Sequence, residues 1–314
     1  MPSQLILICG PTATGKTRLG VALAKALGGE VVSADSMQVY RDLVIGTARP
    51  TQEEMAGVPH HMMGVADPRE NYSVAWYVQE ATACVEDIFR RGRQPIVVGG
   101  TGLYLDALCQ GRSFSDFRPE TGVRTRLQAQ AAQGGLDALW EQLRQVDPET
   151  AARLHPHDAK RIIRALEVWY DTGQTISQHN RQTQTQPPRY QGVTIALTYR
   201  DRQDLYQRID QRVDQMMARG LAEEVRALLA AGIPRTSTAM QAIGYKELVR
   251  ALDAGGDLAP AVEEIKRRSR QYAKRQLTWF RRKEDTEWIL LDKMQDFSSV
   301  VQISTDYLRE KGLP

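Results

Sequence analysis

The segment GPTATGKT at residues 10–17 restricts the possible fold of this chain more than any other feature. A short apolar run at residues 4–9 precedes it, and residues 16–27 follow with leucines at helical spacing. The segment fits the pattern G-x-x-x-x-G-K-[ST] through Gly10, Gly15, Lys16 and Thr17. A strand, a glycine-rich turn and a helix in this order are typical of a phosphate-binding loop.

Backbone N–H groups, a helix N-terminus and a lysine surround the phosphate in such a loop. We therefore expect a di- or triphosphate to bind Gly10, Pro11, Thr12, Ala13, Thr14, Gly15, Lys16 and Thr17. The Thr17 hydroxyl is a candidate ligand of Mg²⁺, which is the expected cofactor. The loop alone does not say which bond of the ligand breaks.

Short apolar strands continue to alternate with helices beyond the loop. We expect strands at residues 30–34 and 95–98 with a helix at 74–91 between them. Further strands are expected at 193–199 and 288–291, the second followed by a closing helix. This alternation predicts an α/β fold, a doubly wound parallel sheet of the P-loop NTPase type.

One segment interrupts the alternation. Residues 113–189 are rich in Gln, Arg and Asp, and we expect them to form an inserted all-helical subdomain. The segment ends in RQTQTQPPR, residues 181–189, which has the composition of a linker. The expected domains are therefore residues 1–112 with 190–314, and the insertion 113–189.

The composition excludes several classes of protein. No apolar run approaches the roughly 18 residues of a membrane span, so no membrane role is expected. The three cysteines, Cys9, Cys84 and Cys109, are widely spaced without CxxC, which argues against a disulfide framework and a zinc site. A reducing cytoplasm is the expected compartment. A monomer is the default expectation.

The net charge is only +3, but basic residues gather in one stretch near the C-terminus. They are Lys266, Arg267, Arg268, Arg270, Lys274, Arg275, Arg281, Arg282 and Lys283. The stretch is either a solvated helix face or a surface for an anionic partner, and both alternatives stay open. Tyr272, Trp279 and Phe280 interleave with it at helical spacing, which favours core positions for these aromatic residues.

Two polar residues follow expected strands. Asp35 comes after the second strand, and Thr101 after the third, which ends in Gly99-Gly100 where a kinase normally has a metal-binding carboxylate. Because the carboxyl ends of parallel strands line the ligand crevice, we expect Asp35 and Thr101 to face the phosphate loop. Asp35 is a candidate metal ligand, general base or helix N-cap.

Eight segments taken together resemble the tRNA dimethylallyltransferases (isopentenyl-tRNA transferases) over nearly the whole chain. They are GPTATGKT, SADSMQVYRDLVIGTARP, PHHMMGVADP, IVVGGTGLYLDAL, HPHDAKRIIRALEV, RIDQRVDQMMARGLAEEV, AMQAIGYKE and YAKRQLTWFRR. The resemblance implies transfer of the dimethylallyl group from dimethylallyl diphosphate to N6 of adenosine 37 in the tRNA anticodon loop. The phosphate loop would then hold a leaving diphosphate. Without a C-terminal CxxC and His pair, the chain resembles the bacterial members.

The resemblance also implies roles for single residues. Asp35 matches the carboxylate that takes a proton from the adenine amino group, and Thr101 matches a hydroxyl that contacts the same base. Lys16, Thr17 and Arg212 are expected to stabilise the charge that develops on the departing diphosphate. On its sequence alone, Arg212 also fits an exposed helix position.

The implied tRNA contacts are spread over the chain. They are Asp35, Ser36, Met37, Gln38, Thr101, Arg124, Ala159, Lys160, Arg161, Ile162, Ile163, Arg164, Gln241, Gly244, Tyr245, Lys246, Lys274 and Arg275. A base stacked in a loop must be extruded to reach a buried diphosphate, and contacts to neighbouring nucleotides offset that cost. His60 and His61 belong to one of the eight segments, but no partner at metal-ligand spacing is visible.

Three other functions compete with this hypothesis. A small-molecule kinase would use the same loop, but GGTG stands where its metal-binding carboxylate is expected. A prenyltransferase acting on free AMP or ATP would not need the basic stretch or the insertion. A non-catalytic RNA-binding NTP switch would not need Asp35.

Overall fold

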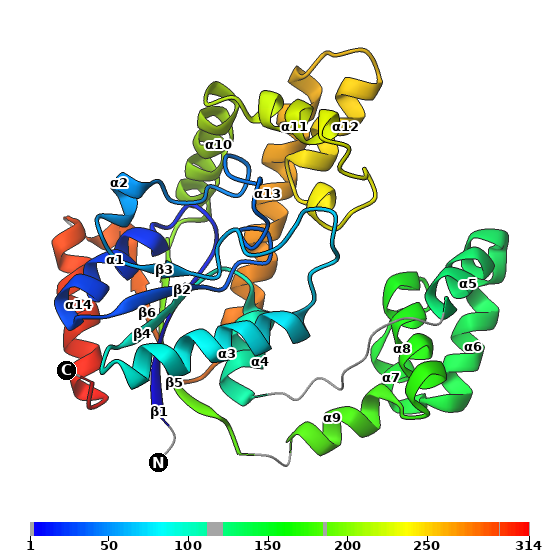
Figure 1. Ribbon diagram of the computed structural model, residues 1–314, viewed down its shortest axis with the longest axis horizontal. Coiled ribbons are helices and arrows are strands. Elements are labelled where there is room, and N and C mark those ends of the chain that lie inside the picture. The colour runs from blue at the N-terminus through cyan, green and yellow to red at the C-terminus, as the bar shows by residue number, and fades with distance from the viewer. Residues whose placement is uncertain (1–2, 112–121, 185–186, 295, 314) are drawn as a thin grey trace. The chain divides into compact units, whose positions relative to one another are not determined.

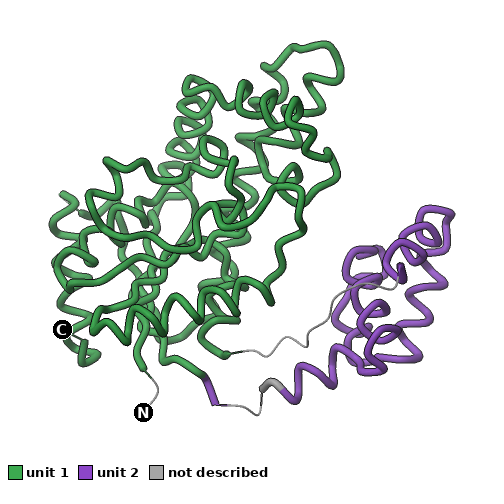
Figure 2. Tube along the Cα trace, in the orientation of Figure 1, with its two compact units in different colours: residues 1–111, 189–314 green, residues 112–188 purple. Residues whose placement is uncertain are grey.

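The computed structural model describes residues 3–111, 122–184, 187–294 and 296–313. The chain forms two compact units, residues 1–111 with 189–314 (unit 1) and residues 112–188 (unit 2), coloured separately in Figure 2. The boundary expected at residues 112–113 lies outside the described residues. In the described part of the chain, no helix is both long and apolar enough to cross a membrane.

Unit 1 is built on a parallel sheet with the strand order β3-β2-β4-β1-β5-β6. The strands are β1 (Ser3–Cys9), β2 (Glu30–Ser33), β3 (His60–His61), β4 (Pro95–Val98), β5 (Tyr190–Thr198) and β6 (Thr286–Leu290). Helices cover both faces, as Figure 1 shows. The expected α/β class, with a parallel doubly wound sheet, is confirmed. Strand β3 was not expected, because two residues are too few for a periodic pattern.

The helices of unit 1 follow the expected alternation in the first half of the chain and dominate the second half. They are α1 (Lys16–Leu27), α2 (Gln52–Met55), α3 (Val74–Arg90), α4 (Gly102–Gln110), α10 (Arg202–Ala218), α11 (Leu221–Ala230), α12 (Tyr245–Asp253), α13 (Ala259–Phe280) and α14 (Phe297–Glu310). Short 3₁₀ turns lie at Ala239–Gln241 and Leu291–Lys293.

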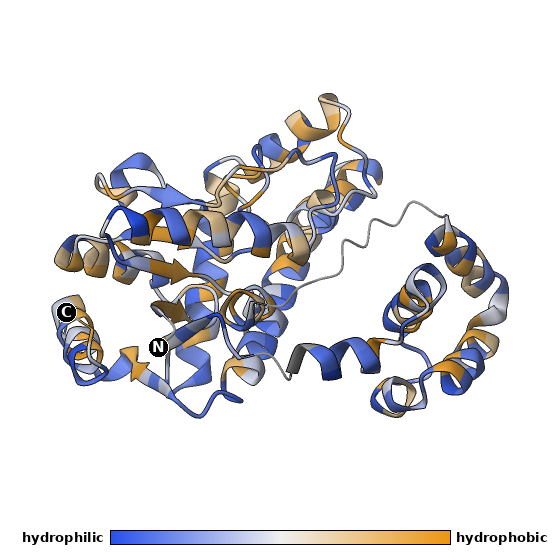
Figure 3. Cartoon of the chain, turned by 60° about the horizontal axis from the view of Figure 1, so that its bottom comes forward, coloured by the Kyte–Doolittle hydropathy of each residue, from blue (hydrophilic) through white to orange (hydrophobic). Residues whose placement is uncertain are grey.

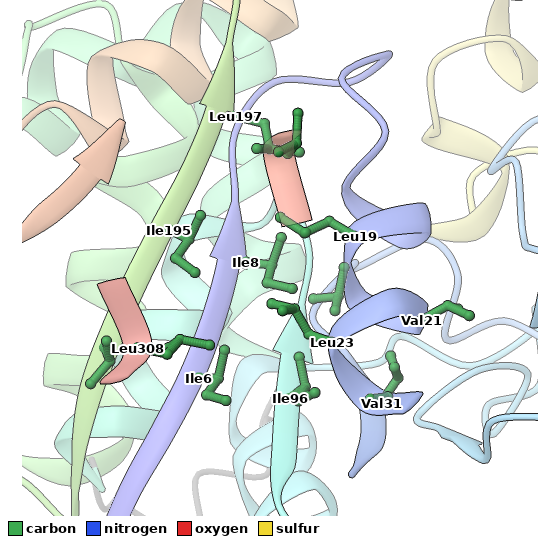
Figure 4. Packing of buried hydrophobic residues seen from close by; sticks show 14 of the residues in the cluster. Ile6, Ile8, Leu19, Val21, Leu23, Val31, Ile96, Ile195, Leu197 and Leu308 are labelled. Carbon is green, nitrogen blue, oxygen red and sulfur yellow. The ribbon is translucent and has the colours of Figure 1, made fainter. Parts of the chain in front are cut away.

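Alternating hydrophobic residues of the strands pack against helix α1 and stabilise the sheet. Ile6 and Ile8 of β1 are completely buried and pack near Leu19 and Leu23 of α1 (Figure 4). The parallel register places Ile6 opposite Ile96 of β4. The strands are accordingly among the most hydrophobic parts of the chain (Figure 3). This packing fixes the carboxyl ends of β1, β2 and β4 side by side, where the loops of the site begin.

The two histidines of β3 have structural contacts. His61 Nε2 lies 2.7 Å from Oε2 of Glu30, a carboxylate that is only 2% exposed. Arg91 donates to both oxygens of the same carboxylate. The hydrogen bond from Arg91 is the main reason why the pKa of Glu30 falls to about 2. His61 and Arg91 therefore hold the start of β2 in place, and His60 contacts the carbonyl of Val58 at 2.8 Å.

Unit 2 is all-helical. Its helices are α5 (Val123–Gln130), the π-helical turn Ala131–Gly135, α6 (Leu136–Val146), α7 (Pro148–Arg153), α8 (Ala159–Thr172) and α9 (Ile176–Gln184). Its core gathers Leu127, Leu139, Leu143, Ala151, Ile162, Ile163, Ala165 and Leu166. The expected linker was wrong at its start: α9 continues through residues 181–184 despite their polar composition.

Candidate functional site

Three loops leave neighbouring strands at the carboxyl edge of the sheet. The phosphate loop follows β1, residues 35–38 follow β2, and residues 99–101 follow β4, which lies between the other two strands. Parts of all three loops line a cavity of about 690 Å³, together with α10, α13 and residues 241–246. The sheet topology therefore places the candidate carboxylate and the phosphate loop in one cavity, as expected for an open α/β fold.

Part of the phosphate loop lines the cavity, and the rest is buried and supports the shape of the loop. Residues 12–17 line the cavity, whereas Gly10 and Pro11, also expected to bind phosphate, are buried behind it. Gly10 has φ +129°, and a Cβ there would lie 2.3 Å from the carbonyl oxygen of Leu197, so only glycine fits. The Thr14 hydroxyl donates to the Pro11 carbonyl at 2.9 Å and stabilises the turn.

Two cations lie in the cavity wall near the loop. Lys16 Nζ donates to the Pro11 carbonyl at 2.6 Å, and Arg212 reaches the cavity from α10. Burial, followed by the neighbouring Arg212 guanidinium, lowers the pKa of the Lys16 ammonium to about 8. Burial also lowers the pKa of Arg212. Neither residue forms an ion pair with another described residue. Asp35 and Glu54 act on these cations only from beyond ion-pair distance, so the wall favours a bound anion.

We expect diphosphate binding to weaken as the pH rises above about 8, where Lys16 loses its proton in the empty cavity. An anion favours the charged ammonium, so binding above this pH takes up a proton, and affinity falls by up to about tenfold per pH unit. Calorimetric titration of diphosphate in buffers of different ionisation enthalpy measures both quantities. A constant affinity between pH 7 and 9.5 would contradict the lowered pKa.

Asp35 caps a turn, not the helix that one alternative expected, and it also lines the cavity. Its Oδ1 accepts the backbone N–H groups of Met37 at 2.8 Å and Gln38 at 3.2 Å. No described residue donates a hydrogen bond to Oδ2, and the residue lines the cavity. Capping of this turn is compatible with the catalytic alternative, because one oxygen orients the carboxyl group and leaves the other available.

Thr101 lies at the carboxyl end of β4 next to the loop that carries Asp35. It is absent from the cavity lining, and its Oγ1 accepts the Ser36 backbone N–H at 3.1 Å. The hydroxyl thus joins the carboxyl end of β4 to that of β2. Its expected contact with the acceptor adenine stays a prediction, because this hydrogen bond with Ser36 does not exclude a ligand contact of the same hydroxyl.

Gln276 of α13 is a site residue that the sequence analysis missed. Its side chain is 5% exposed; Oε1 accepts the Thr12 N–H at 3.0 Å and Nε2 donates to the Gly100 carbonyl at 2.9 Å. A Cβ on Gly100 would lie 2.1 Å from this Nε2. Gln276 therefore ties the phosphate loop to β4 and α13. A polar residue at helical spacing from Ala273 and Phe280 was the available signal.

Five of the nine residues in the basic stretch form ion pairs. Ion pairs join Lys266 to Asp214, Arg267 and Arg268 to Glu264, Arg270 to Asp210, and Lys283 to Asp106. Lys274, Arg275, Arg281 and Arg282 are exposed and form no ion pair within the described residues. Lys274 and Arg275 lie on α13, and Arg281 and Arg282 directly follow it.

The aromatic residues of α13 divide into three cases. Phe280 is completely buried, which confirms its expected core position. Tyr272 lines the cavity instead. Trp279 is 36% exposed, and its indole Nε1 donates to Asp106 at 2.8 Å, so the expectation of a core position was wrong for this residue.

Several expected tRNA contacts are buried side chains. Ile162 and Ile163 of α8 belong to the core of unit 2, at 0% and 7% exposure. Tyr245 is also completely buried. These three side chains therefore present little surface to RNA, whereas their neighbours Lys160 and Arg161 on α8 are exposed.

Two other arginines expected to contact tRNA meet inside unit 2. Arg124 of α5 and Arg164 of α8 both donate to Oε2 of Glu167, at 2.7 and 2.8 Å. Glu167 is completely buried, whereas both arginine side chains remain 43–49% exposed. The carboxylate therefore gathers two guanidinium groups at one place on the surface of this unit.

The fold and the site together define a P-loop protein in which the phosphate loop and the carboxylate of Asp35 line one cavity. The family model described as IPP transferase matches residues 38–283, and the one described as isopentenyl transferase matches residues 3–63. The chain is 46% identical to the tRNA dimethylallyltransferase of Caldanaerobacter subterraneus subsp. tengcongensis over 312 residues, 99% of each chain. It is 47% identical to that of Geobacillus thermodenitrificans over 311 residues, 99% of this chain and 98% of the relative.

Two solved structures agree with these relatives. The full-length tRNA isopentenylpyrophosphate transferase from Bacillus halodurans superposes with a TM-score of 0.71 at 43% identity, covering 99% of this chain and 98% of that one. A eukaryotic dimethylallyltransferase acting on tRNA gives 0.81 at 32% identity, with 98% and 80% coverage. The chain belongs to the tRNA dimethylallyltransferase family, and the resemblance of its eight segments is confirmed.

Proposed function

We propose that the protein transfers the dimethylallyl group of dimethylallyl diphosphate to N6 of adenosine 37 in the tRNA anticodon loop. The relatives named above are transferases of this kind. The observation that carries the proposal for this chain is that Asp35 and the phosphate loop line one cavity, from strands on either side of β4.

The phosphate loop would hold a leaving group. As the bond between the allylic carbon and the diphosphate oxygen breaks, negative charge develops on that oxygen. Lys16 and Arg212 line the same cavity and are not neutralised by an acidic partner among the described residues. Prealigned positive charge stabilises such developing charge strongly.

Asp35 would activate the acceptor. An exocyclic amine is a poor nucleophile because its lone pair is delocalised into the purine ring. A carboxylate that accepts the amino proton while N6 bonds to the allylic carbon raises its reactivity. Oδ2 of Asp35 is available for this role, since Oδ1 is occupied by the N–H groups of Met37 and Gln38.

The donor set near the loop fits Mg²⁺. Thr17 lines the cavity, and its hydroxyl has no hydrogen-bond partner among the described residues. Magnesium takes oxygen ligands and keeps most of them from water and substrate phosphates, so one protein hydroxyl suffices. When bound there with the diphosphate, it would add positive charge opposite the departing oxygen.

The remaining wall of the cavity suits a small apolar group. It includes Ile209, Val213 and Met216 of α10 and Ile265 of α13. Aliphatic side chains next to the phosphate loop provide a place for a five-carbon chain without an unsatisfied polar atom. This arrangement supports a prenyl diphosphate over a nucleotide as the ligand.

The tRNA side of the proposal rests on residues around the cavity and on unit 2. Met37, Gln38, Gln241, Lys246 and Arg275 line the cavity, where an extruded adenine would meet Asp35. In unit 2 the exposed Lys160 and Arg161, with the paired Arg124 and Arg164, are proposed to contact the anticodon stem-loop.

A transfer assay tests the function directly. The protein is mixed with Mg²⁺, unmodified tRNA and dimethylallyl diphosphate labelled in its five-carbon group, and the tRNA is digested to nucleosides. Parallel reactions contain AMP in place of tRNA, or ATP labelled on its γ-phosphate. Label on a tRNA adenosine supports the proposal. Label on AMP, or release of the γ-phosphate without transfer to tRNA, would replace it by one of the competing functions.

We expect tRNA binding to weaken steeply with salt, and replacement of both Lys274 and Arg275 by Ala to lower the slope. Each lost phosphate contact reduces the slope of log K against log[salt] by about 0.7 to 0.9. Binding is measured by fluorescence anisotropy across a salt series. The matched control replaces Lys266 and Arg267, which are neutralised by acidic partners and should change the slope less. Equal slopes for wild type and both variants would show that Lys274 and Arg275 do not contact tRNA phosphates and that this face of α13 is only solvated.

A further inference from the structure

Two segments that line the cavity, residues 46–50 and 241–246, are connected through Glu224, which does not itself line the cavity. Glu224 lies in the first turn of α11. Its carboxylate is half-buried and accepts hydrogen bonds from both segments or their immediate neighbours.

The contacts of Glu224 use both of its oxygens. Oε2 accepts the backbone N–H groups of Ile45 at 2.7 Å and Val44 at 3.1 Å. Oε1 accepts the Gly46 N–H at 3.2 Å and the hydroxyl of Tyr245 at 2.5 Å. A charged acceptor with four donors in this arrangement is stronger than four neutral hydrogen bonds.

Tyr245 completes the connection on the other side. Its ring is completely buried against Gly46, where an added Cβ would lie 2.5 Å from a ring carbon. Burial, together with the Glu224 carboxylate, raises the pKa of Tyr245, so the hydroxyl remains a donor at all working pH values. Tyr245 begins α12 directly after Gly244, which lines the cavity.

Backbone carbonyl groups next to residues 44–46 also accept hydrogen bonds, from the side chains of Arg49 and Gln38. Arg49 donates to the carbonyls of Tyr40 and Leu43, the second at 3.3 Å. Gln38 Nε2 donates to the Thr47 carbonyl at 3.2 Å. A movement of residues 44–46 would therefore be transmitted to Gln38, three residues after Asp35.

We propose that Glu224 is a positioning residue for the acceptor adenosine: through Tyr245 and residues 44–46 it sets the spacing between two walls of the cavity. The proposal rests on the proposed function, because it assigns these walls to the tRNA side. Glu224 touches neither substrate. It keeps Gln38 and Asp35 at a fixed distance from residues 241–246, so that an extruded adenine meets Asp35 in one orientation.

The test compares Glu224→Gln with Glu223→Gln. The amide keeps the size of Glu224, but its nitrogen cannot accept the hydrogen bonds now made to one oxygen. Glu223 is adjacent, exposed and paired only with Arg226 among the described residues, so it is a matched control. We expect Glu224→Gln to raise the KM for tRNA by about tenfold or more. The dissociation constant for dimethylallyl diphosphate should stay within about twofold of wild type, because the phosphate loop is untouched.

Tyr245→Phe provides a second measurement if Glu224→Gln fails to fold. It retains the ring that packs on Gly46 and removes one of the four donors, so a smaller rise in the KM for tRNA is expected. The double variant should be less impaired than the sum of both effects, since the two changes remove a shared contact.

The outcomes separate this proposal from the proposed function. Wild-type protein that transfers no label to tRNA would overturn the function itself. Active wild type, with Glu224→Gln behaving like Glu223→Gln, would overturn the positioning role alone. Equal losses of affinity for tRNA and dimethylallyl diphosphate would also overturn it, because they would indicate general loosening of the fold. If only Tyr245→Phe folds, an unchanged KM for tRNA decides against the proposal.

Discussion

Replacing Asp35 with Asn is expected to reduce turnover by roughly 10²-fold or more while leaving tRNA affinity nearly unchanged. The amide oxygen of Asn can still accept the N–H groups of Met37 and Gln38, so the turn after β2 should persist. The amide nitrogen that replaces Oδ2 cannot take up the amino proton of adenine. Single-turnover transfer and equilibrium tRNA binding measure the two effects separately.

Two comparison variants separate the role of Asp35 as a base from its role as a cap. Asp42→Asn changes an exposed carboxylate of the same loop and should leave turnover unchanged. Asp35→Ala removes both the cap and the base, and should additionally weaken tRNA binding because the turn loses two hydrogen bonds. If Asp35→Asn turned over like wild type, Asp35 would act only as a cap, and another group would have to receive the proton.

The parts of the site that the sequence predicted are encoded locally. The phosphate loop needs a strand, glycines and a helix within about two dozen residues, and α1 begins and ends at the expected residues. Asp35 was predicted because it directly follows a strand, and parallel strands end at a common edge. Local pattern and fold rules were sufficient for both residues.

Other parts of the site depend on pairs of residues far apart in the chain. Gln276 binds Thr12 across 264 residues, and Glu224 binds Val44 across 180. Neither spacing leaves a periodic signal in one sequence. Thr101 was placed at the correct strand end, but the direction of its hydroxyl depends on Ser36, which reaches it only in the folded sheet.

The charge of α13 shows a related limit. The sequence contains nine basic residues between 266 and 283. In the structure, five of them form ion pairs with Asp and Glu residues of α4, α10 and α13 itself. The segment HPHDAKRIIRALEV shows the same limit, because a resemblance does not say which side chains are exposed. It led to the expectation that Ile162 and Ile163 contact RNA together with Lys160 and Arg161. The helix turns the two isoleucines into the core.

Replacing Lys16 with Met is expected to reduce turnover by roughly 10²–10³-fold, as for the loss of one prealigned group that stabilises developing charge. Met keeps an unbranched side chain in the wall, so the loop should retain its shape. The positive charge of Lys16 is lost, whereas the neighbouring Arg212 guanidinium remains in the cavity wall. Single-turnover transfer at saturating dimethylallyl diphosphate measures the effect on the chemical step.

The matched control is Lys25→Met, which changes an exposed lysine in the last turn of the same helix and should leave turnover unchanged. The pH dependence provides a second, independent readout. If the pKa of about 8 belongs to Lys16, the fall in diphosphate affinity above that pH should disappear in Lys16→Met. A variant that keeps both the turnover and the pH dependence of wild type would exclude Lys16 as the charge opposite the leaving diphosphate. The stabilisation would then have to come from Arg212, the loop N–H groups and Mg²⁺.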